Sequence, residues 1–98
     1  MLTGKQRSYL KSIANGLKPI TQIGKSGITD AFLEQLDLAL NSREIVKVTI
    51  LETSLLETKE TANEVAQKVR AEFVQAIGNK FVIYRKNHEN PKIELPKR

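Results

Sequence analysis

The stretch of residues 19–40, PITQIGKSGITDAFLEQLDLAL, joins a short strand to a helix through a loop with a glycine at each end. Pro19 disfavours helix in the residue before it, so an extended segment is expected from this point. Thr29 is of the type that caps a helix, and apolar residues then recur at helical spacing. We therefore predict a strand over 19–23, a loop over 24–27 and a helix over 29–41. The buried face of that helix is expected to hold Phe32, Leu33, Leu36, Ala39 and Leu40.

The next elements downstream are a strand over residues 45–51 and a helix over 58–73. The strand alternates apolar with polar side chains, so one of its faces is expected to be buried. The alternating residues are Val46, Lys47, Val48, Thr49 and Ile50. In the helix, Thr61 and Glu64 have the spacing of a capping box, and an apolar stripe runs as far as Phe73.

A β-hairpin is predicted at the end of the folded part. Gly78-Asn79 is a two-residue hairpin signal, and it separates predicted strands over 74–77 and 81–84. The strand over 81–84 is apolar on both faces, so we expect it to be central in the sheet.

The residues that precede the quoted stretch predict a helix over 3–15. Thr3 and Gln6 have the spacing of a capping box at its start. Asn15-Gly16 is expected to end it in a left-handed conformation.

The order of elements is therefore α-β-α-β-α-β-β. Two strand–helix–strand crossovers imply parallel pairs, and the final hairpin is antiparallel, so the sheet should be mixed and four-stranded. This is an α/β arrangement of the two-layer α+β sandwich kind, in a single domain over residues 1–86. Residues 87–98 contain two prolines and many charges, and they predict a mobile basic tail.

The distribution of charge points to an anionic partner. The net charge is +5, and residues 1–29 contain five bases and no acid. Such a one-sided basic segment favours nucleic acid over an evenly charged surface. The sequence has no cysteine, no apolar run near the ~20 residues of a membrane span and no signal-peptide pattern at its start. We expect a cytoplasmic protein without membrane contact.

Catalytic chemistry finds little support in the sequence. The one histidine, His88, falls in the predicted tail, where a general base would have neither a fixed partner nor a protected pocket. Without cysteine, a metal site would depend on carboxylates alone; Glu57, Glu60 and Glu64 share a helix face, which is more typical of a solvated helix start. We expect no enzyme activity, no metal, no cofactor and no small-molecule substrate.

The loop Gly24, Lys25, Ser26, Gly27 is the candidate site. It precedes a helix, whose free N–H groups and positive dipole end attract phosphate. The side chains of Lys25 and Ser26 add a charge and a donor. The same logic operates in the GXXG loop of KH modules, although a plain strand-to-helix turn is the alternative interpretation. The bases expected to extend the surface are Lys5, Arg7, Lys11 and Lys18, with weak contacts from the tail bases, counted from Lys80 onward. Aromatic residues are few, which favours recognition of backbone and shape.

Four segments together resemble one known family. They are LTGKQR at 2–7, LKPI with QIGKSGIT at 17–29, EIVKV at 44–48 and GNKFVIYR at 78–85. In this order and spacing they resemble the CRM domain (chloroplast RNA splicing and ribosome maturation), in particular its bacterial stand-alone YhbY-like form.

The resemblance implies several expectations. The fold would be similar to the C-terminal domain of bacterial translation initiation factor three with an added N-terminal helix, and the family's GxxG loop maps onto residues 24–27. The activity would be RNA binding without catalysis. Apart from the resemblance, we also expect a monomer. The partner would be ribosomal RNA in the precursor of the large ribosomal subunit, the pre-50S particle, whose assembly the protein would assist. Three alternatives stay open: a protein-interaction or ribosome-docking module, an RNA splicing or chaperone factor, and a small nuclease.

Overall fold

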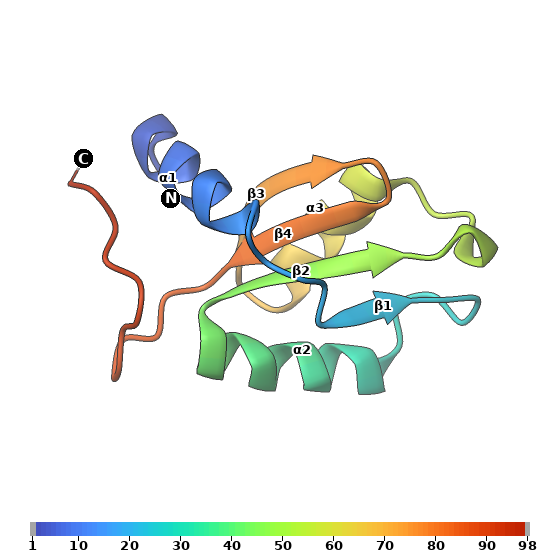
Figure 1. The fold of residues 1–98 in the computed structure, drawn as a ribbon. Helices are drawn as coiled ribbons and strands as arrows, with labels where there is room; N and C mark the ends of the chain where they lie inside the picture. Colours follow the sequence, from blue (N-terminus) through green and yellow to red (C-terminus); the bar gives the residue numbers. More distant parts are fainter. Residues whose placement is uncertain (1, 98) are drawn as a thin grey trace.

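The computed structural model describes residues 2–97 (Figure 1). Met1 and Arg98, the outermost residues of the predicted domain and of the predicted tail, lie outside the described residues. The elements are, in chain order, α1 (Gly4–Ala14), β1 (Thr21–Ile23), α2 (Asp30–Arg43), β2 (Ile45–Ile50), the 3-10 turn η1 (Glu52–Ser54), α3 (Thr58–Lys68), β3 (Glu72–Ile77) and β4 (Lys80–Tyr84). The predicted order of helices and strands is confirmed.

The four strands form one mixed sheet in the order β1-β2-β4-β3. β1 and β2 are parallel, and β4 is antiparallel to both of its neighbours. The mixed sheet, the first parallel pair and the central position of β4 are therefore confirmed. As the second crossover implies, β3 runs parallel to β2. The two strands are not hydrogen-bonded neighbours, however, because β4 lies between them. Gly78 forms the turn of the hairpin with a φ of 60°.

Two apolar clusters lie on opposite faces of the sheet, because successive side chains of a strand point to opposite sides. α2 and α3 cover one face, where they pack on Val46, Val48 and Phe81 among others. α1 lies on the other face and covers one end of it (Figure 1), where Leu10 and Ala14 pack with the partners Ile45, Val74, Val82 and Tyr84. The sheet and the α2/α3 layer form the predicted two-layer sandwich, with α1 added outside it.

α1 begins as predicted but ends differently from the prediction. The capping box is present: the Gln6 N–H donates to the Thr3 hydroxyl and the Thr3 N–H to the Gln6 side chain, both at 3.1 Å. The left-handed stop at Asn15-Gly16 is wrong. Asn15 has a φ of −60°, and the chain leaves the helix through a tight turn in which the Gly16 N–H donates to the Ile13 carbonyl.

α3 begins at Thr58, as predicted, but its cap and its end differ from the prediction. It begins after Glu57, whose carboxylate accepts from the N–H groups of Lys59 and Glu60, so the predicted capping box of Thr61 and Glu64 is wrong. It ends at Lys68, because Arg70 has a φ of 58° and a left-handed residue breaks the helix. Phe73, predicted to close the helix, lies in β3 instead; its spacing from Val69 fits a helix, and the backbone at Arg70 overrides that spacing.

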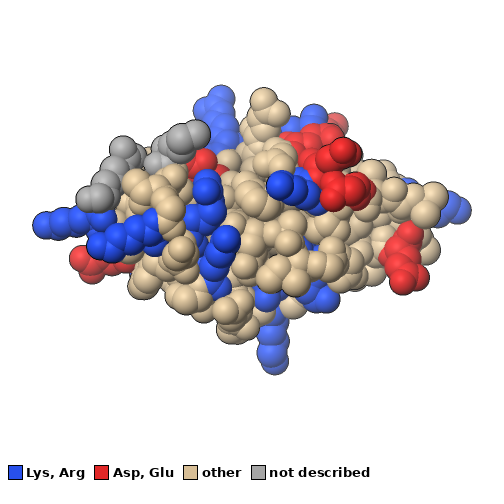
Figure 2. Space-filling view, turned by 90° about the horizontal axis from the view of Figure 1, so that it is seen from above, with Lys and Arg blue, Asp and Glu red and all other residues tan. Residues whose placement is uncertain are grey.

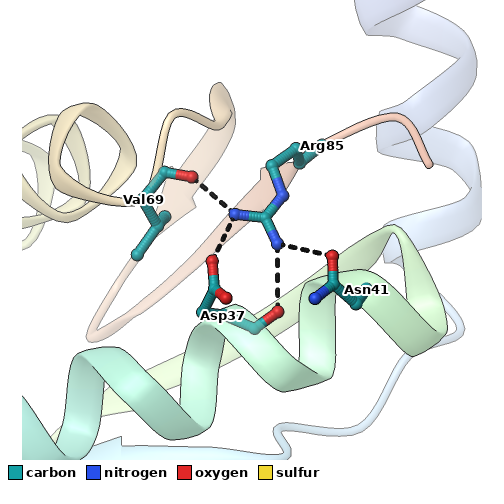
Figure 3. Close-up of polar contacts among 4 residues, drawn as sticks. All are labelled: Asp37, Asn41, Val69 and Arg85. Atoms are coloured by element: carbon teal, nitrogen blue, oxygen red, sulfur yellow. Dashed lines mark hydrogen bonds and ion pairs between the residues drawn. The ribbon is translucent and has the colours of Figure 1, made fainter. Parts of the chain in front are cut away.

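Arg85 links the end of β4 to α2 and to the residue that follows α3 (Figure 3). Its Nη1 donates to Asp37 Oδ1 at 2.7 Å and to the Val69 carbonyl at 2.8 Å. Its Nη2 donates to the Asp37 carbonyl and to Asn41 Oδ1, both at 3.0 Å. Four of its five donors are therefore used within the protein.

The segment 87–97, predicted to be a mobile tail, lies against the domain in the structure. The reason is Glu44, a fully buried residue with a φ of 65°. Its carboxylate accepts from the backbone N–H groups of Asn87, Lys92 and Ile93. Ile93 and Leu95 then pack against the cluster under α1. Composition alone suggests mobility because it does not reveal a buried carboxylate that binds this segment.

We expect Glu44 to make the stability of the protein sensitive to acid. Burial by itself would raise the pKa of Glu44, but the N–H groups of Asn87, Lys92 and Ile93, with the charge of Lys86, outweigh burial and hold the pKa below its ordinary value of 4.5. The ionised carboxylate therefore stabilises the fold above pH 4.5, and this contribution is lost as the pH falls through the lowered pKa.

Urea unfolding at a series of pH values from neutral to strongly acidic measures this contribution. The free energy of unfolding of the wild type should fall more steeply below pH 4.5 than that of Glu44→Gln, which has no proton to take up at this position. Parallel curves for the two proteins would contradict the assignment to Glu44.

Candidate nucleic-acid interface

Residues 24–27, hereafter the glycine loop, form a tight turn at the carboxyl end of β1. The Gly27 N–H donates to the Gly24 carbonyl at 2.9 Å. Gly27 has a φ of 72°, in the left-handed region that glycine enters without strain. A Cβ added to Gly24 would meet the Leu51 side chain at 3.6 Å, an ordinary contact. The turn geometry therefore requires glycine at Gly27, whereas Gly24 tolerates a small side chain as far as intramolecular space is concerned.

The glycine loop gathers hydrogen-bond donors at one exposed point. The side chains of Lys25 and Ser26 are exposed. Within the described part of the chain, the backbone N–H groups of Lys25, Ser26 and Ile28 have no hydrogen-bond partner. The Thr29 hydroxyl caps α2 by accepting from the Phe32 N–H at 3.0 Å, which confirms the predicted cap. An anion-binding site is typically formed by unpaired donors, a positive side chain and a helix N-terminus.

One carboxylate opposes this arrangement. Asp30 lies in the first turn of α2 and is exposed. It already complements the positive end of the helix, so it lowers the net attraction for a phosphate group. Lys25 balances that charge, and the unpaired N–H groups remain as directional donors.

The bases of α1 form a second group, hereafter the α1 bases: Lys5, Arg7 and Lys11. Lys5 and Lys11 are exposed, as is Lys18 beyond the helix. Arg7 is half-buried, and its Nε donates to the Phe73 carbonyl at 3.4 Å. In Figure 2 the lysine and arginine side chains gather at the end of the molecule where α1 and the C-terminal segment lie.

The structure does not bring the α1 bases and the glycine loop together. α1 packs over Ile45 at the start of β2, whereas the glycine loop follows Ile23, which pairs with Ile50 at the other end of the same strand. Five residue steps of extended chain span about 17 Å. The two predicted groups thus lie at opposite ends of the sheet (Figure 1), and an RNA that contacts both must extend along it.

Two lysines lie between these groups: Lys47, which is absent from the predicted site, and Lys80, which is predicted only among the tail bases. Lys47 of β2 and Lys80 of β4 are on the sheet face that α1 leaves partly open, since their strand neighbours Val46 and Phe81 belong to the opposite cluster. The alternation of β2 places Lys47 on the polar face. What the sequence does not reveal is that α1 stops short of it. Arg85 is not available to a partner in the same way, because its donors bind Asp37, Asn41 and Val69.

The helical layer on the other face carries the opposite charge. α2 holds Asp30, Glu34 and Asp37 against one base, Arg43. α3 holds as many bases as acids. The molecule is therefore polarised across its sheet, with the excess of bases on the side of α1.

Other kinds of site were sought in the described residues. Over residues 2–97 no group of three or more His, Asp or Glu side chains lies close enough to hold a metal ion. His88 is exposed in the segment after β4. No helix in the described part of the chain is long and apolar enough to cross a membrane.

Comparison with known proteins identifies relatives along the whole chain. The family described as CRS1 / YhbY (CRM) domain matches residues 2–85. The probable RNA-binding protein YqeI of Bacillus subtilis is 42% identical over 96 residues, which cover 98% of this chain and 100% of that protein. An RNA-binding protein of Haemophilus influenzae is 36% identical over 98 residues, covering 99% of this chain and 97% of its own.

A plant relative and a solved structure extend the comparison. The chloroplastic CRM-domain containing factor CFM2 of Arabidopsis thaliana is 30% identical over 104 residues, which cover 97% of this chain but 10% of that protein. The solution structure of a hypothetical protein from Staphylococcus aureus, suggested to bind RNA, superposes with a TM-score of 0.79. It is 44% identical in sequence, and the match covers 98% of this chain and 100% of that one.

Proposed function

Since the chain belongs to the CRS1 / YhbY (CRM) domain family, we propose that it is an RNA-binding protein without catalytic activity. The glycine loop holds a phosphate of the RNA through backbone N–H groups, Lys25 and Ser26. The α1 bases and Lys18 bind the backbone at the other end of the sheet. The observation that carries this proposal is the set of unpaired N–H groups at Lys25, Ser26 and Ile28, next to the capped start of α2.

The RNA that we propose is ribosomal RNA in the precursor of the large ribosomal subunit, and the protein assists assembly of that particle in the cytoplasm as a monomer. The YhbY-like motifs support this choice, as do the bacterial relatives that match over their whole lengths and are named RNA-binding proteins. The separation of the two basic groups supports a folded RNA, whose phosphates are spread over a rigid surface, over a short flexible strand.

Crosslinking in cells tests the identity of the RNA. Ultraviolet crosslinking of the full chain, followed by sequencing of the attached RNA, should recover positions in large-subunit ribosomal RNA, enriched in precursor particles over mature ribosomes. Recovery of messenger or transfer RNA alone would contradict the ribosomal part of the proposal and leave RNA binding intact.

Binding should also depend steeply on salt. If about five phosphates are neutralised, the logarithm of the association constant falls against the logarithm of salt concentration with a slope of about −3 to −4.5. Fluorescence anisotropy with a labelled ribosomal RNA fragment, at four or more potassium chloride concentrations, measures the slope. A slope near zero would exclude a phosphate-dominated interface.

The acidic surface of α2 supports a second candidate, docking onto basic ribosomal proteins. Asp30 and Glu34 are exposed, and the helix has one base, Arg43. Under this alternative the protein binds purified precursor particles but has negligible affinity for their deproteinised RNA. Comparing those two binding constants for the same preparation distinguishes the candidates.

A further inference from the structure

A shallow hollow lies on the open part of the sheet face, next to the end of α1. It has a volume of about 150 Å³ and is lined by Asn15, Lys47, Gln75, Ile77, Lys80 and Val82. Val82 is buried and forms its floor, while Ile77 is 64% exposed at its side. At roughly 30 Å³ for each water molecule, the hollow holds about five waters, which is far below the ~300 Å³ of a drug-sized pocket.

The hollow contains two amide side chains that find no partner in the described part of the chain. Among residues 2–97, neither the Asn15 nor the Gln75 side chain makes a hydrogen bond. Gln75 reaches this face because of a β-bulge: the pairing of β3 with β4 shifts between Phe73 and Gln75, so that Gln75 lies opposite Val82. Bulges of this kind re-aim a side chain and are frequent beside functional sites.

The charges around the hollow are of one sign. Lys47 and Lys80 lie on its rim, and no carboxylate lines it. Amides donate and accept at once, so they match the mixed edges of nucleobases. An apolar wall at Ile77 suits the face of a planar ring, and lysines suit the phosphates on either side of it.

We propose that this hollow binds one unpaired nucleotide of the RNA and reads its base. The base lies against Ile77 with its edge on the amides of Asn15 and Gln75, while Lys47 and Lys80 hold the adjoining phosphates. The inference rests on the proposed RNA-binding function and adds to it, because the glycine loop and the α1 bases grip backbone and cannot distinguish sequences.

The test uses four RNA hexanucleotides, uridine at every position except the third, which is A, C, G or U. Each is titrated into the full-length ¹⁵N-labelled protein and followed by NMR. The side-chain NH₂ signals of Asn15 and Gln75 should shift, and the favoured base should bind about fivefold more tightly than the least favoured one. The double variant Asn15→Ala with Gln75→Ala should abolish this preference. Gln22→Ala, an exposed glutamine of β1 outside the hollow, is the matched control and should retain it.

The possible failures are distinguishable. If the hexanucleotides shift signals of the glycine loop or α1 but leave Asn15 and Gln75 unmoved, or if all four bind equally, the hollow is not a nucleotide site and the proposed function stands. If they do not bind at all while a folded ribosomal RNA fragment does, the hollow is likewise excluded. If neither RNA binds, the proposed function itself fails.

Discussion

Replacing Lys25 and Ser26 together with Asp is expected to weaken RNA binding by about 100-fold or more, because a hydrogen bond to a charged group contributes about 1.5–3 kcal/mol and the new carboxylates repel phosphate. Both side chains are exposed and neither supports the fold, so the far-ultraviolet circular dichroism spectrum and the urea midpoint should stay close to those of the wild type. Anisotropy with a ribosomal RNA fragment measures the affinity.

The control must separate the position of these residues from their charge. Lys68→Asp with Asn63→Asp changes the net charge by the same amount on α3, where both residues are exposed on the layer that faces away from α1. This variant should lose only a small part of the affinity. If both variants weaken binding equally, overall charge is responsible and the glycine loop is not the site.

Replacing Glu44 with Ala is expected to lower the free energy of unfolding by about 3 kcal/mol, one of the larger effects available to a single side chain. The carboxylate binds three backbone N–H groups of the segment 87–97 and is fully buried. Its loss removes those hydrogen bonds and loosens the packing of Ile93 and Leu95 on the cluster under α1. Urea unfolding measures the change, and amide hydrogen exchange at Asn87, Lys92 and Ile93 should accelerate.

Glycine at the same position separates the carboxylate from the backbone. Glu44 has a φ of 65°, which alanine adopts at a cost of about 1 kcal/mol and glycine adopts freely. Glu44→Gly should therefore be more stable than Glu44→Ala but still release the segment 87–97. If exchange in that segment is unchanged in both variants, Glu44 does not hold it.

The parts of the fold that depend on residues close together in the sequence could be predicted from it. The hydroxyl of Thr3, the turn at Gly78-Asn79 and the alternation along β2 act through neighbours a few residues away, and the structure confirms all three. The C-terminal end of α3 depends on tertiary contacts instead. At Arg70 the chain turns into β3, where pairing with β4 outweighs the helical spacing of Phe73.

The candidate site also has some parts that nearby residues determine and others that depend on distant contacts. The cap at Thr29 and the position of the glycine loop between β1 and α2 follow from nearby residues, and the sequence predicts them. The hollow does not follow from nearby residues, since it depends on where α1 stops and on a bulge that moves Gln75 to the open face. The roles of Glu44 and Arg85 could not be predicted from the sequence either, because their partners are distant along the chain. The partners of Glu44 lie 43 to 49 positions away, and those of Arg85 lie 16 to 48 positions away.

The central place of β4 has a consequence for biosynthesis. Residues 80–84 are the last of the four sheet strands to be synthesised, yet they supply the only hydrogen-bonded link, within the described chain, between β3 and the rest of the sheet. A nascent chain that ends before them exposes two unpaired strand edges and lacks Phe81 and Ile83 from its core. We therefore expect the sheet to be completed only after residues 80–84 have been made, and a product truncated before β4 to stay incompletely folded and open to proteolysis.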